Sequence, residues 1–378
     1  MKESATTTMM KAAIATGVVD FDKYIHVKND WPRPTLDTAI DGKTGKRVVD
    51  LVDDGHMIIQ VLACALAPGD CRLFKGKTDM MQLPKGGRPY VIGSDVCGIV
   101  TEVGKDETYF NIGDKVIARF DEPQPHGMCA EYACVKTKFS EKCPISIPAI
   151  EACTLPASAA AAKLVATKFL SSTDRVLLLG ASGGVGTFFC QYAKNIVGVS
   201  YLAATTTQGK LAKSLGVDRV IDYRKENWWE LESEYKNQPF DVVVDLVNGR
   251  NWQRGACSGT KVLKKKAKYL QLMSGVETEI DVSWGMIGVV PLMFQMIGRL
   301  LYSTLHPNCP KYIMPQGLDL QPGDLKGILE DVEQGRIKVI LDPSSPFPFE
   351  EIPVRQAMKL QNSIHAHGKV VVKIKNEK

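Results

Sequence analysis

The chain has 378 residues, of which 44% are hydrophobic and 24% charged, with a formal net charge of +5. These values are ordinary for a soluble globular protein, and at roughly 150 residues per domain the length predicts two domains. The modest charge and the absence of repeats or low-complexity tracts argue against a nucleic-acid-binding protein. Ten cysteines include no C-x-x-C pair, which favours free thiols in a reducing compartment.

The first residues, MKESATTTMMKAAIATG, argue against a secretory signal because they contain Glu3 and lack an apolar core segment. The first arginine is Arg33, which also weakens a mitochondrial presequence. The same residues do not exclude a short plastid-type leader. We therefore expect a cytoplasmic protein, with a plastid or mitochondrial location as the alternative.

From Val48 to Cys143 the pattern consists of short β-like runs separated by glycine and proline, such as HMIIQVLACAL and GDKVIARF. This spacing predicts a largely antiparallel barrel. Tyr132 and Lys136 match a Y-x-x-x-K pair of short-chain reductases, but that pair should follow a cofactor loop. Here it comes earlier in the chain, so we interpret YACVK as a barrel strand.

The period changes at Pro156, which opens a predicted helix, PASAAAAKLVATKFL. Beyond Thr173, short apolar runs alternate with helical stretches, which predicts a parallel sheet covered by helices. The helix GKLAKSLG should end at Gly216. The closing run GKVVVKI would return to the first domain if it pairs there. The six apolar runs are Val176 to Leu179, Val199 to Ala204, Val220 to Ile221, Val242 to Val244, Tyr269 to Met273 and Tyr312 to Met314.

The stretch RVLLLGASGGVGTFFCQYAK has two interpretations. Gly180 to Gly184 fit G-x-S-x-G, the turn that presents a nucleophilic serine, here Ser182. The glycines 180, 183 and 186 also fit a dinucleotide-binding turn between a strand and a helix. Only the second interpretation gives Gly186 a task, which is to let the helix pack against the strand. Three histidines follow the turn, so a catalytic triad is not excluded by counting, but the array of six runs favours the cofactor turn.

The choice of cofactor depends on the end of the second apolar run. NAD sites place an acid about 20 residues after the first glycines, where it binds the ribose 2′-hydroxyl. Here the chain has Thr205, Thr206 and Thr207, followed by Lys210. Neutral donors and a cation suit a 2′-phosphate, which predicts NADPH.

Two further segments have competing interpretations. Lys261 and Lys264 to Lys268 form the densest basic run, which we interpret as a solvated helix end and not as a nucleic-acid patch. Ser283 to Leu305 approaches the length of a membrane span, but Pro291, Gln295 and Arg299 interrupt it. It predicts a buried helix pair or an oligomer surface, and peripheral membrane contact stays open.

In both halves the chain resembles the zinc-independent quinone oxidoreductase branch of the medium-chain dehydrogenase/reductase superfamily, and especially its reticulon-interacting and plastid-envelope groups. The likeness covers nearly the whole chain. It is carried, in order, by IGSDVCGIVTEVG, FNIGDKVIA, LPASAAAA, VLLLGASGGVGTFFCQYAK, SLGVDRVIDY, FDVVVDLVNG and a long C-terminal match.

The resemblance implies an α/β fold: a GroES-like β-barrel catalytic domain (1–153), a Rossmann doubly wound parallel sheet that binds NADP (154–317), and a return to the catalytic domain (318–378). It also implies an active site in the cleft between the domains and a homodimer. The cofactor-binding residues that we predict are Gly180, Ser182, Gly183, Gly184, Val185, Gly186, Thr205, Lys210 and Tyr223.

The substrate side departs from the family. Zinc-dependent relatives have G-H-E where this chain has Gly93-Ser94-Asp95, so no metal is expected. Many relatives have N-P-x-D where this chain has Ala67-Pro68-Gly69-Asp70, and Arg72 replaces a tyrosine. Asp70 and Arg72 are the candidate catalytic residues, although they could instead pair with each other across a turn.

Without a metal to polarise an oxygen atom, intrinsically electrophilic acceptors are favoured. We therefore predict an NADPH-dependent oxidoreductase that passes hydride to a quinone or to an alkene conjugated to a carbonyl. The alternative is a non-catalytic NADPH-binding module that senses redox state or binds RNA or protein.

Overall fold

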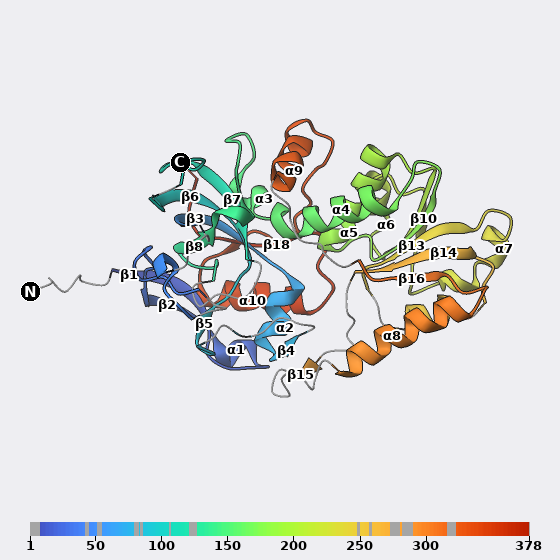
Figure 1. Ribbon diagram of the computed structural model, residues 1–378, viewed down its shortest axis with the longest axis horizontal. Helices are drawn as coiled ribbons and strands as arrows, with labels where there is room; N and C mark the ends of the chain where they lie inside the picture. The colour runs from blue at the N-terminus through green and yellow to red at the C-terminus, as the bar shows by residue number, and fades with distance from the viewer. Residues whose placement is uncertain are drawn as a thin grey trace, which may run out of the picture. The chain divides into compact units, whose positions relative to one another are not determined.

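The computed structural model describes residues 8–41, 45–50, 55–78, 83, 86–105, 107–120, 127–247, 250–256, 259–272, 280–281, 290–315 and 323–377 (Figure 1). The chain divides into two compact units. Unit 1 comprises Met1–Ala157, Leu320–Glu333 and Leu341–Lys378, and unit 2 comprises Ser158–Asp319 and Gln334–Ile340. Each unit has its own sheet and its own hydrophobic core.

The long strand β3 (His56–Leu66) organises unit 1. It pairs antiparallel with β6 (Asp95–Val103), β8 (Tyr132–Lys136) and β18 (Val370–Lys373). Ten of its eleven side chains are buried, because its side chains pack into two separate core clusters, the larger containing Met57 and Ile59 and the smaller containing Ile58. The antiparallel barrel predicted from the sequence is confirmed, YACVK is one of its strands, and the closing run GKVVVKI returns to it. The sheet is completed by β7 (Lys115–Arg119), β9 (Ser140–Lys142) and β17 (Phe347–Pro348).

The other elements of unit 1 surround this barrel. A three-stranded sheet contains β1 (Met9–Ala15), β2 (Ile25–Pro32) and β5 (Tyr90–Val91). The helix α10 (Glu351–Asn362) packs against β2, β18 and α2 (Pro68–Phe74). The remaining elements are α1 (Phe21–Tyr24), α3 (Ala149–Ala152), α9 (Asp324–Glu333), β4 (Lys77–Thr78) and short 3₁₀ turns at Val48–Asp50 and Thr137–Phe139.

Unit 2 contains a parallel six-stranded sheet in the order β12-β11-β10-β13-β14-β16. Each strand contains or overlaps one of the six apolar runs, so the predicted doubly wound fold is confirmed. The order turns back at β10, which lies between β11 and β13, and ligands of such sheets bind beyond the carboxyl ends at this point. The strands are β10 (Arg175–Leu179), β11 (Tyr201–Thr205), β12 (Arg219–Ile221), β13 (Phe240–Asp245), β14 (Leu263–Gln271) and β16 (Lys311–Ile313).

Helices connect these strands. The helix predicted from Pro156 begins as a π-helical turn, Leu155–Ala159, and continues as α4 (Ala160–Phe169). Gly216 has φ of +89° after α6 (Gly209–Ser214), as expected for a residue that ends a helix. The other segments are α5 (Gly184–Gln191), α7 (Glu232–Tyr235), α8 (Val290–Leu305), β15 (Ile280–Asp281), π-helical turns at Tyr192–Val197 and Trp252–Ala256, and a 3₁₀ turn at Trp228–Glu230.

The apolar segment Ser283 to Leu305 is described from residue 290, where α8 begins. Phe294 and Leu305 are 70% and 75% exposed, so this part of the segment is not the buried helix pair that was one of the two expectations. The reason is the placement of its charge: Arg299 faces the sheet, and the apolar side chains face away from it. In the described part of the chain, no helix is long and apolar enough to cross a bilayer.

Candidate functional site

The glycine turn follows β10 directly. Gly180 has φ of +94°, a conformation that favours glycine. Its backbone N–H lies 3.0 Å from Thr205 Oγ1 and 3.3 Å from the Thr205 carbonyl oxygen, and the Ala181 N–H donates to that carbonyl oxygen as well. Thr205 is buried at the end of β11, in register with Leu179. Thr205 therefore holds the first residues of the turn against the neighbouring strand β11.

The helix α5 begins immediately after the turn, with Gly183 as its N-cap. A glycine cap has no side chain, so it leaves the amide groups of the first turn to an external acceptor. A Cβ atom on Gly186 would lie 2.1 Å from the Gly180 carbonyl oxygen, so helix and turn approach each other too closely for any other residue. Ser182, Gly184 and Val185 are half-buried around this N-terminus. The residues present therefore fit a bound pyrophosphate.

The hydrolase interpretation requires a histidine beside Ser182. The Ser182 hydroxyl makes no hydrogen bond within the described residues. His306 is the histidine of unit 2, and its ring stacks on Tyr302 at 3.8 Å between ring centroids. Its Nδ1 lies 3.0 Å from the Tyr302 carbonyl oxygen. Among the described residues of unit 2, no hydrogen bond therefore joins Ser182 to a histidine, which favours the phosphate-type turn.

The side chains predicted to select the cofactor lie at the carboxyl ends of β11 and β12. Thr206 is buried, and its hydroxyl caps the next loop by accepting a hydrogen bond from the Gln208 N–H at 2.9 Å. Lys210 is exposed in the first turn of α6, and Tyr223 is 54% exposed just after β12. Thr205 and Ile221, the last residues of β11 and β12, are in register. Lys210 and Tyr223 follow these two strand ends, so they belong to the same edge of the sheet. No acid follows β11 directly.

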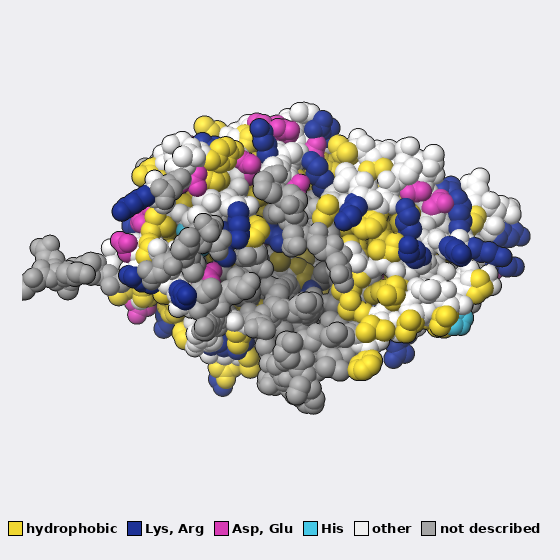
Figure 2. Space-filling model, viewed as in Figure 1, with side chains coloured by type: hydrophobic (Ala, Val, Ile, Leu, Met, Phe, Trp, Pro, Cys, Tyr) yellow, Lys and Arg dark blue, Asp and Glu magenta, His cyan; other side chains and the backbone are white. Residues whose placement is uncertain are grey.

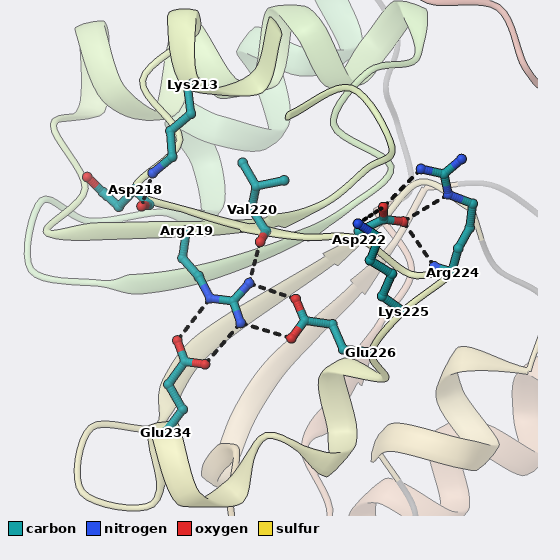
Figure 3. A network of polar contacts seen from close by, with 9 residues as sticks. All are labelled: Lys213, Asp218, Arg219, Val220, Asp222, Arg224, Lys225, Glu226 and Glu234. Atoms are coloured by element: carbon teal, nitrogen blue, oxygen red, sulfur yellow. Dashed lines mark hydrogen bonds and ion pairs between the residues drawn. The ribbon is translucent and has the colours of Figure 1, made fainter. Parts of the chain in front are cut away.

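Figure 3 shows a polar network at β12 that the sequence analysis missed. Arg219 donates to both carboxylate oxygens of Glu226, at 2.7 and 2.9 Å, and to both of Glu234, at 3.1 and 3.2 Å. At the other end of the strand, Arg224 donates to Asp222, and this bond lowers the pKa of Asp222 to about 2. Arg224, with its guanidinium paired to Asp222, therefore lies beside Tyr223, one residue beyond the predicted set.

A second missed network joins the ends of β13, β14 and β16. The Tyr269 hydroxyl donates to Asp245 Oδ2 at 2.6 Å, and the Tyr312 hydroxyl donates to Gln271 Oε1 at 2.9 Å. Arg299 of α8 donates to the same Gln271 oxygen. Burial raises the pKa of Tyr269 well above its usual value, and the Asp245 carboxylate raises it further. The acid that ends the apolar run DVVVD is the sequence signal that could have indicated this network.

The candidate substrate residues lie in unit 1, at the start of α2. Asp70 is 8% exposed, and its Oδ2 accepts hydrogen bonds from the Ala67 N–H at 2.7 Å and the Ser94 hydroxyl at 3.3 Å. Burial, the main cause, and the nearby Asp95 carboxylate, the second, together raise the pKa of Asp70 to about 7. The Ala67 N–H, Lys369 and Ser94 partly offset this rise. Asp70 can therefore hold a proton near neutral pH.

Asp95 and Lys369 form the buried ion pair behind this group. Asp95 Oδ2 and Lys369 Nζ are 3.7 Å apart, and both side chains are at most 3% exposed. Burial raises the pKa of Asp95 to about 6, although Lys369 and Arg119 oppose the shift. Sequence reasoning identified Ser94 and Asp95 only as the place of a missing metal ligand, and it missed Lys369, which lies some 270 residues further along the chain.

Arg72 is half-buried on the same helix as Asp70. Residues two positions apart on a helix do not face each other, and the hydrogen bonds of Asp70 run to Ala67 and Ser94.

At Gly93, φ is +93° and a Cβ atom would lie 2.6 Å from Cys64 Sγ, so this turn has no spare space. Within the described residues, no group of three or more His, Cys, Asp and Glu side chains could hold a metal ion.

An antiparallel barrel and a doubly wound parallel sheet with a phosphate-type glycine turn define a two-domain protein of the dinucleotide-binding class. Two family models match the chain: one described as the alcohol dehydrogenase GroES-like domain, over residues 53–169, and one described as a zinc-binding dehydrogenase, over residues 215–372.

Among curated relatives, the "NADPH-dependent alkenal/one oxidoreductase, chloroplastic" of Arabidopsis thaliana is 31% identical over 86% of this chain and 74% of that protein. The "NAD(P)H oxidoreductase RTN4IP1, mitochondrial" of Bos taurus is 30% identical over 84% of this chain and 82% of that protein. The solved quinone oxidoreductase of Coxiella burnetii shares the fold, with a TM-score of 0.71 and 22% identity, over 97% of this chain and 100% of that one. The chain belongs to the quinone oxidoreductase branch of the medium-chain dehydrogenase/reductase superfamily.

Proposed function

We propose that this protein is an NADPH-dependent oxidoreductase that transfers hydride to a quinone or to an alkene conjugated to a carbonyl group. The observation that carries the proposal is the turn from Gly180 to Gly186, in which the spacing of strand and helix admits only glycine at 186. Membership of the family, and the named activity of its Arabidopsis relative, support the reaction class.

The chain's own residues bind and orient the cofactor. The amide groups at the start of α5 would hold the pyrophosphate, because nothing on Gly183 competes for them. Lys210, Tyr223 and Arg224 would hold a 2′-phosphate at the edge formed by β11 and β12. NADPH, when bound, supplies the hydride.

We propose that Asp70 and Arg72 act on the acceptor. Arg72 would stabilise negative charge that develops on the carbonyl or quinone oxygen. Asp70, whose pKa is raised to about 7, would hold a proton at Oδ1 for delivery to the reduced product, because Oδ2 already accepts two hydrogen bonds. Ser94 would position Asp70, since its hydroxyl donates to Oδ2.

The test is NADPH oxidation by the purified protein against a panel of quinones, enals and enones, with product analysis. Arg72→Met should lower kcat with a smaller effect on the Kd of NADPH, whereas Arg72→Lys should restore part of the rate. If the protein binds NADPH tightly but turns over no acceptor in the panel, the non-catalytic alternative replaces this proposal.

Metal independence follows from Ser94 in the place of a ligand histidine. We expect activity to survive prolonged incubation with a chelator, and the purified protein to contain far less than one zinc per chain. Stoichiometric zinc that is lost together with activity would contradict this prediction.

Assembly and location remain predictions. We propose a homodimer, as the resemblance implies, to be checked by sedimentation velocity. The names of the two relatives refer to chloroplasts and mitochondria, which supports an organelle over the cytoplasm. Imaging of the tagged full-length protein would decide the compartment.

A further inference from the structure

The helix α8 turns its one charged residue toward the sheet and its apolar side chains toward solvent. Arg299 is the only charged residue from 290 to 305. It is 6% exposed and donates to Gln271, at the end of β14. A helix on the surface of a globular domain normally buries its apolar side and exposes its charges. The orientation of α8 is the opposite, so the sheet does not explain its apolar residues.

Five apolar residues of α8 are exposed, and we call them the apolar strip: Phe294, Ile297, Leu300, Leu301 and Leu305. Figure 2 shows hydrophobic side chains in a row over this helix. Phe294, Leu301 and Leu305 follow the helical spacing i, i+7 and i+11, so they share one side of α8. Exposed apolar patches of this kind mark interaction sites.

A glycine lies in the middle of this side. Gly298 follows Phe294 by four residues and precedes Leu301 by three, and it is exposed. Within the described residues, a Cβ atom on Gly298 would meet nothing beyond the backbone of its own helix within 4 Å. Glycine is unfavourable in the interior of a helix, so the fold of the chain does not explain its presence here. A missing side chain does allow a second helix to approach α8 closely.

We propose that the apolar strip packs against the apolar strip of a second copy of this chain, so that two α8 helices meet across a two-fold axis. In such a contact the same surface meets itself. A strip without charged residues is complementary to itself, because no charge of one copy faces the same charge of the other. The inference rests on the proposed homodimer, and it adds the surface that joins the two copies.

The exposed area of the apolar strip is sufficient for this contact. The five residues are 47% to 75% exposed. At roughly 200 Å² for a fully exposed residue of this size, they expose on the order of 600 Å². Two copies would bury about 1,200 Å² between them, which is the lower limit for a specific and stable interface.

A lipid surface is the other occupant that an exposed apolar helix side could have. Helices that lie in a membrane interface carry Lys and Arg beside their apolar side, where these residues contact lipid phosphates. The one cation of α8 is buried against Gln271 instead. The helix therefore offers no charge to a headgroup, which favours the second copy.

The experiment is sedimentation velocity of the full-length protein over a range of concentrations. Phe294→Ser/Leu301→Ser should raise the Kd of the dimer at least tenfold. Gly298→Leu should raise it at least tenfold as well, although it makes the helix more apolar, because the added side chain would separate the two helices. A contact that depended on apolar area alone would be strengthened by this substitution, so its sign tests the close approach.

Matched controls use exposed residues of unit 1. Ile112→Ser removes an apolar side chain that is 69% exposed, against 70% for Phe294. Gly86→Leu adds the same side chain at an exposed glycine whose Cβ atom would also have nothing within 4 Å. Both controls should dimerise like the unmodified protein. Circular dichroism checks that every variant is folded.

Three results would overturn the proposal. If the unmodified protein is a monomer at every concentration, both the homodimer and this surface are wrong. If the dimer persists unchanged in Phe294→Ser/Leu301→Ser or in Gly298→Leu, the homodimer stands but uses another surface. If the unmodified protein binds phosphatidylglycerol vesicles as a monomer and Phe294→Ser/Leu301→Ser does not, the apolar strip is a lipid-binding surface.

Discussion

The Tyr269 hydroxyl donates a hydrogen bond of 2.6 Å to Asp245 Oδ2, inside the core of unit 2. Oδ1 of the same carboxylate accepts from the Val247 N–H at 3.0 Å, and Asp245 is in register with Leu179, the last residue before the glycine turn. The pair therefore fixes Val247, which follows β13, next to Gly180. A Cβ atom on Gly180 would lie 2.8 Å from Val247 Cγ2.

Tyr269→Phe should destabilise the protein, because it removes a donor from a buried carboxylate. We expect the free energy of unfolding to fall by about 1–3 kcal/mol, measured by chemical denaturation. Tyr302→Phe, at a half-exposed tyrosine of α8, serves as the control and should change it by less than about 0.5 kcal/mol. A Tyr269→Phe protein as stable as the unmodified one would show that this hydrogen bond does not hold the loop.

Gly186→Ala should abolish NADPH binding or unfold the turn, since its Cβ would lie 2.1 Å from the Gly180 oxygen and 2.8 Å from the Ala181 oxygen. Gly183→Ala is the matched variant, because the nearest atom to its Cβ is 3.8 Å away and its φ of −75° is allowed. Melting temperature and NADPH fluorescence titration should separate the two. If Gly186→Ala binds NADPH with unchanged affinity, the turn does not hold the cofactor.

Lys210→Ala should weaken NADPH binding by about 1–3 kcal/mol and leave NADH binding nearly unchanged, because only NADPH carries a 2′-phosphate. Isothermal titration with both cofactors measures this difference. Lys236→Ala, at an exposed lysine that follows α7, should affect neither. Equal losses for the two cofactors in Lys210→Ala would mean that this lysine does not select between them.

Stability should depend on the protonation of Asp70. Its pKa is about 7 in the folded chain and near 3.8 when exposed, so between these values the folded state retains a proton that the unfolded state has released. The free energy of unfolding then falls as pH rises through this window. Asp70→Asn removes this titration, so the variant should gain up to about 4 kcal/mol relative to the unmodified protein between pH 4 and pH 8.

Denaturation midpoints at a series of pH values give this difference. Asp30→Asn, which changes an exposed acid of β2, serves as the control. A constant difference between Asp70→Asn and the unmodified protein across the range would contradict a raised pKa at Asp70.

The sequence by itself determined the two architectures. Alternation of short apolar runs with helices is sufficient for a parallel sheet, since strands that are covered on both faces must be apolar throughout. The glycine turn could also be predicted from a short stretch of sequence, because the φ of Gly180 and the close approach at Gly186 involve only residues of the turn itself. These features depend on periodicity and backbone conformation, which a single sequence records.

Only the tertiary structure decided which distant side chains meet. Asp95 and Lys369 are paired because β18 returns to β3, and Tyr269 reaches Asp245 because β13 and β14 are neighbours. The raised pKa of Asp70 depends on burial and on Asp95, and neither is encoded near residue 70. The same holds for α8: its composition predicted either a buried helix pair or an oligomer surface, and the structure excludes the first, because Arg299 turns inward to Gln271 and the described apolar side chains are exposed. Contacts between residues far apart in the chain are chosen by the packing of whole elements, and no local pattern specifies them.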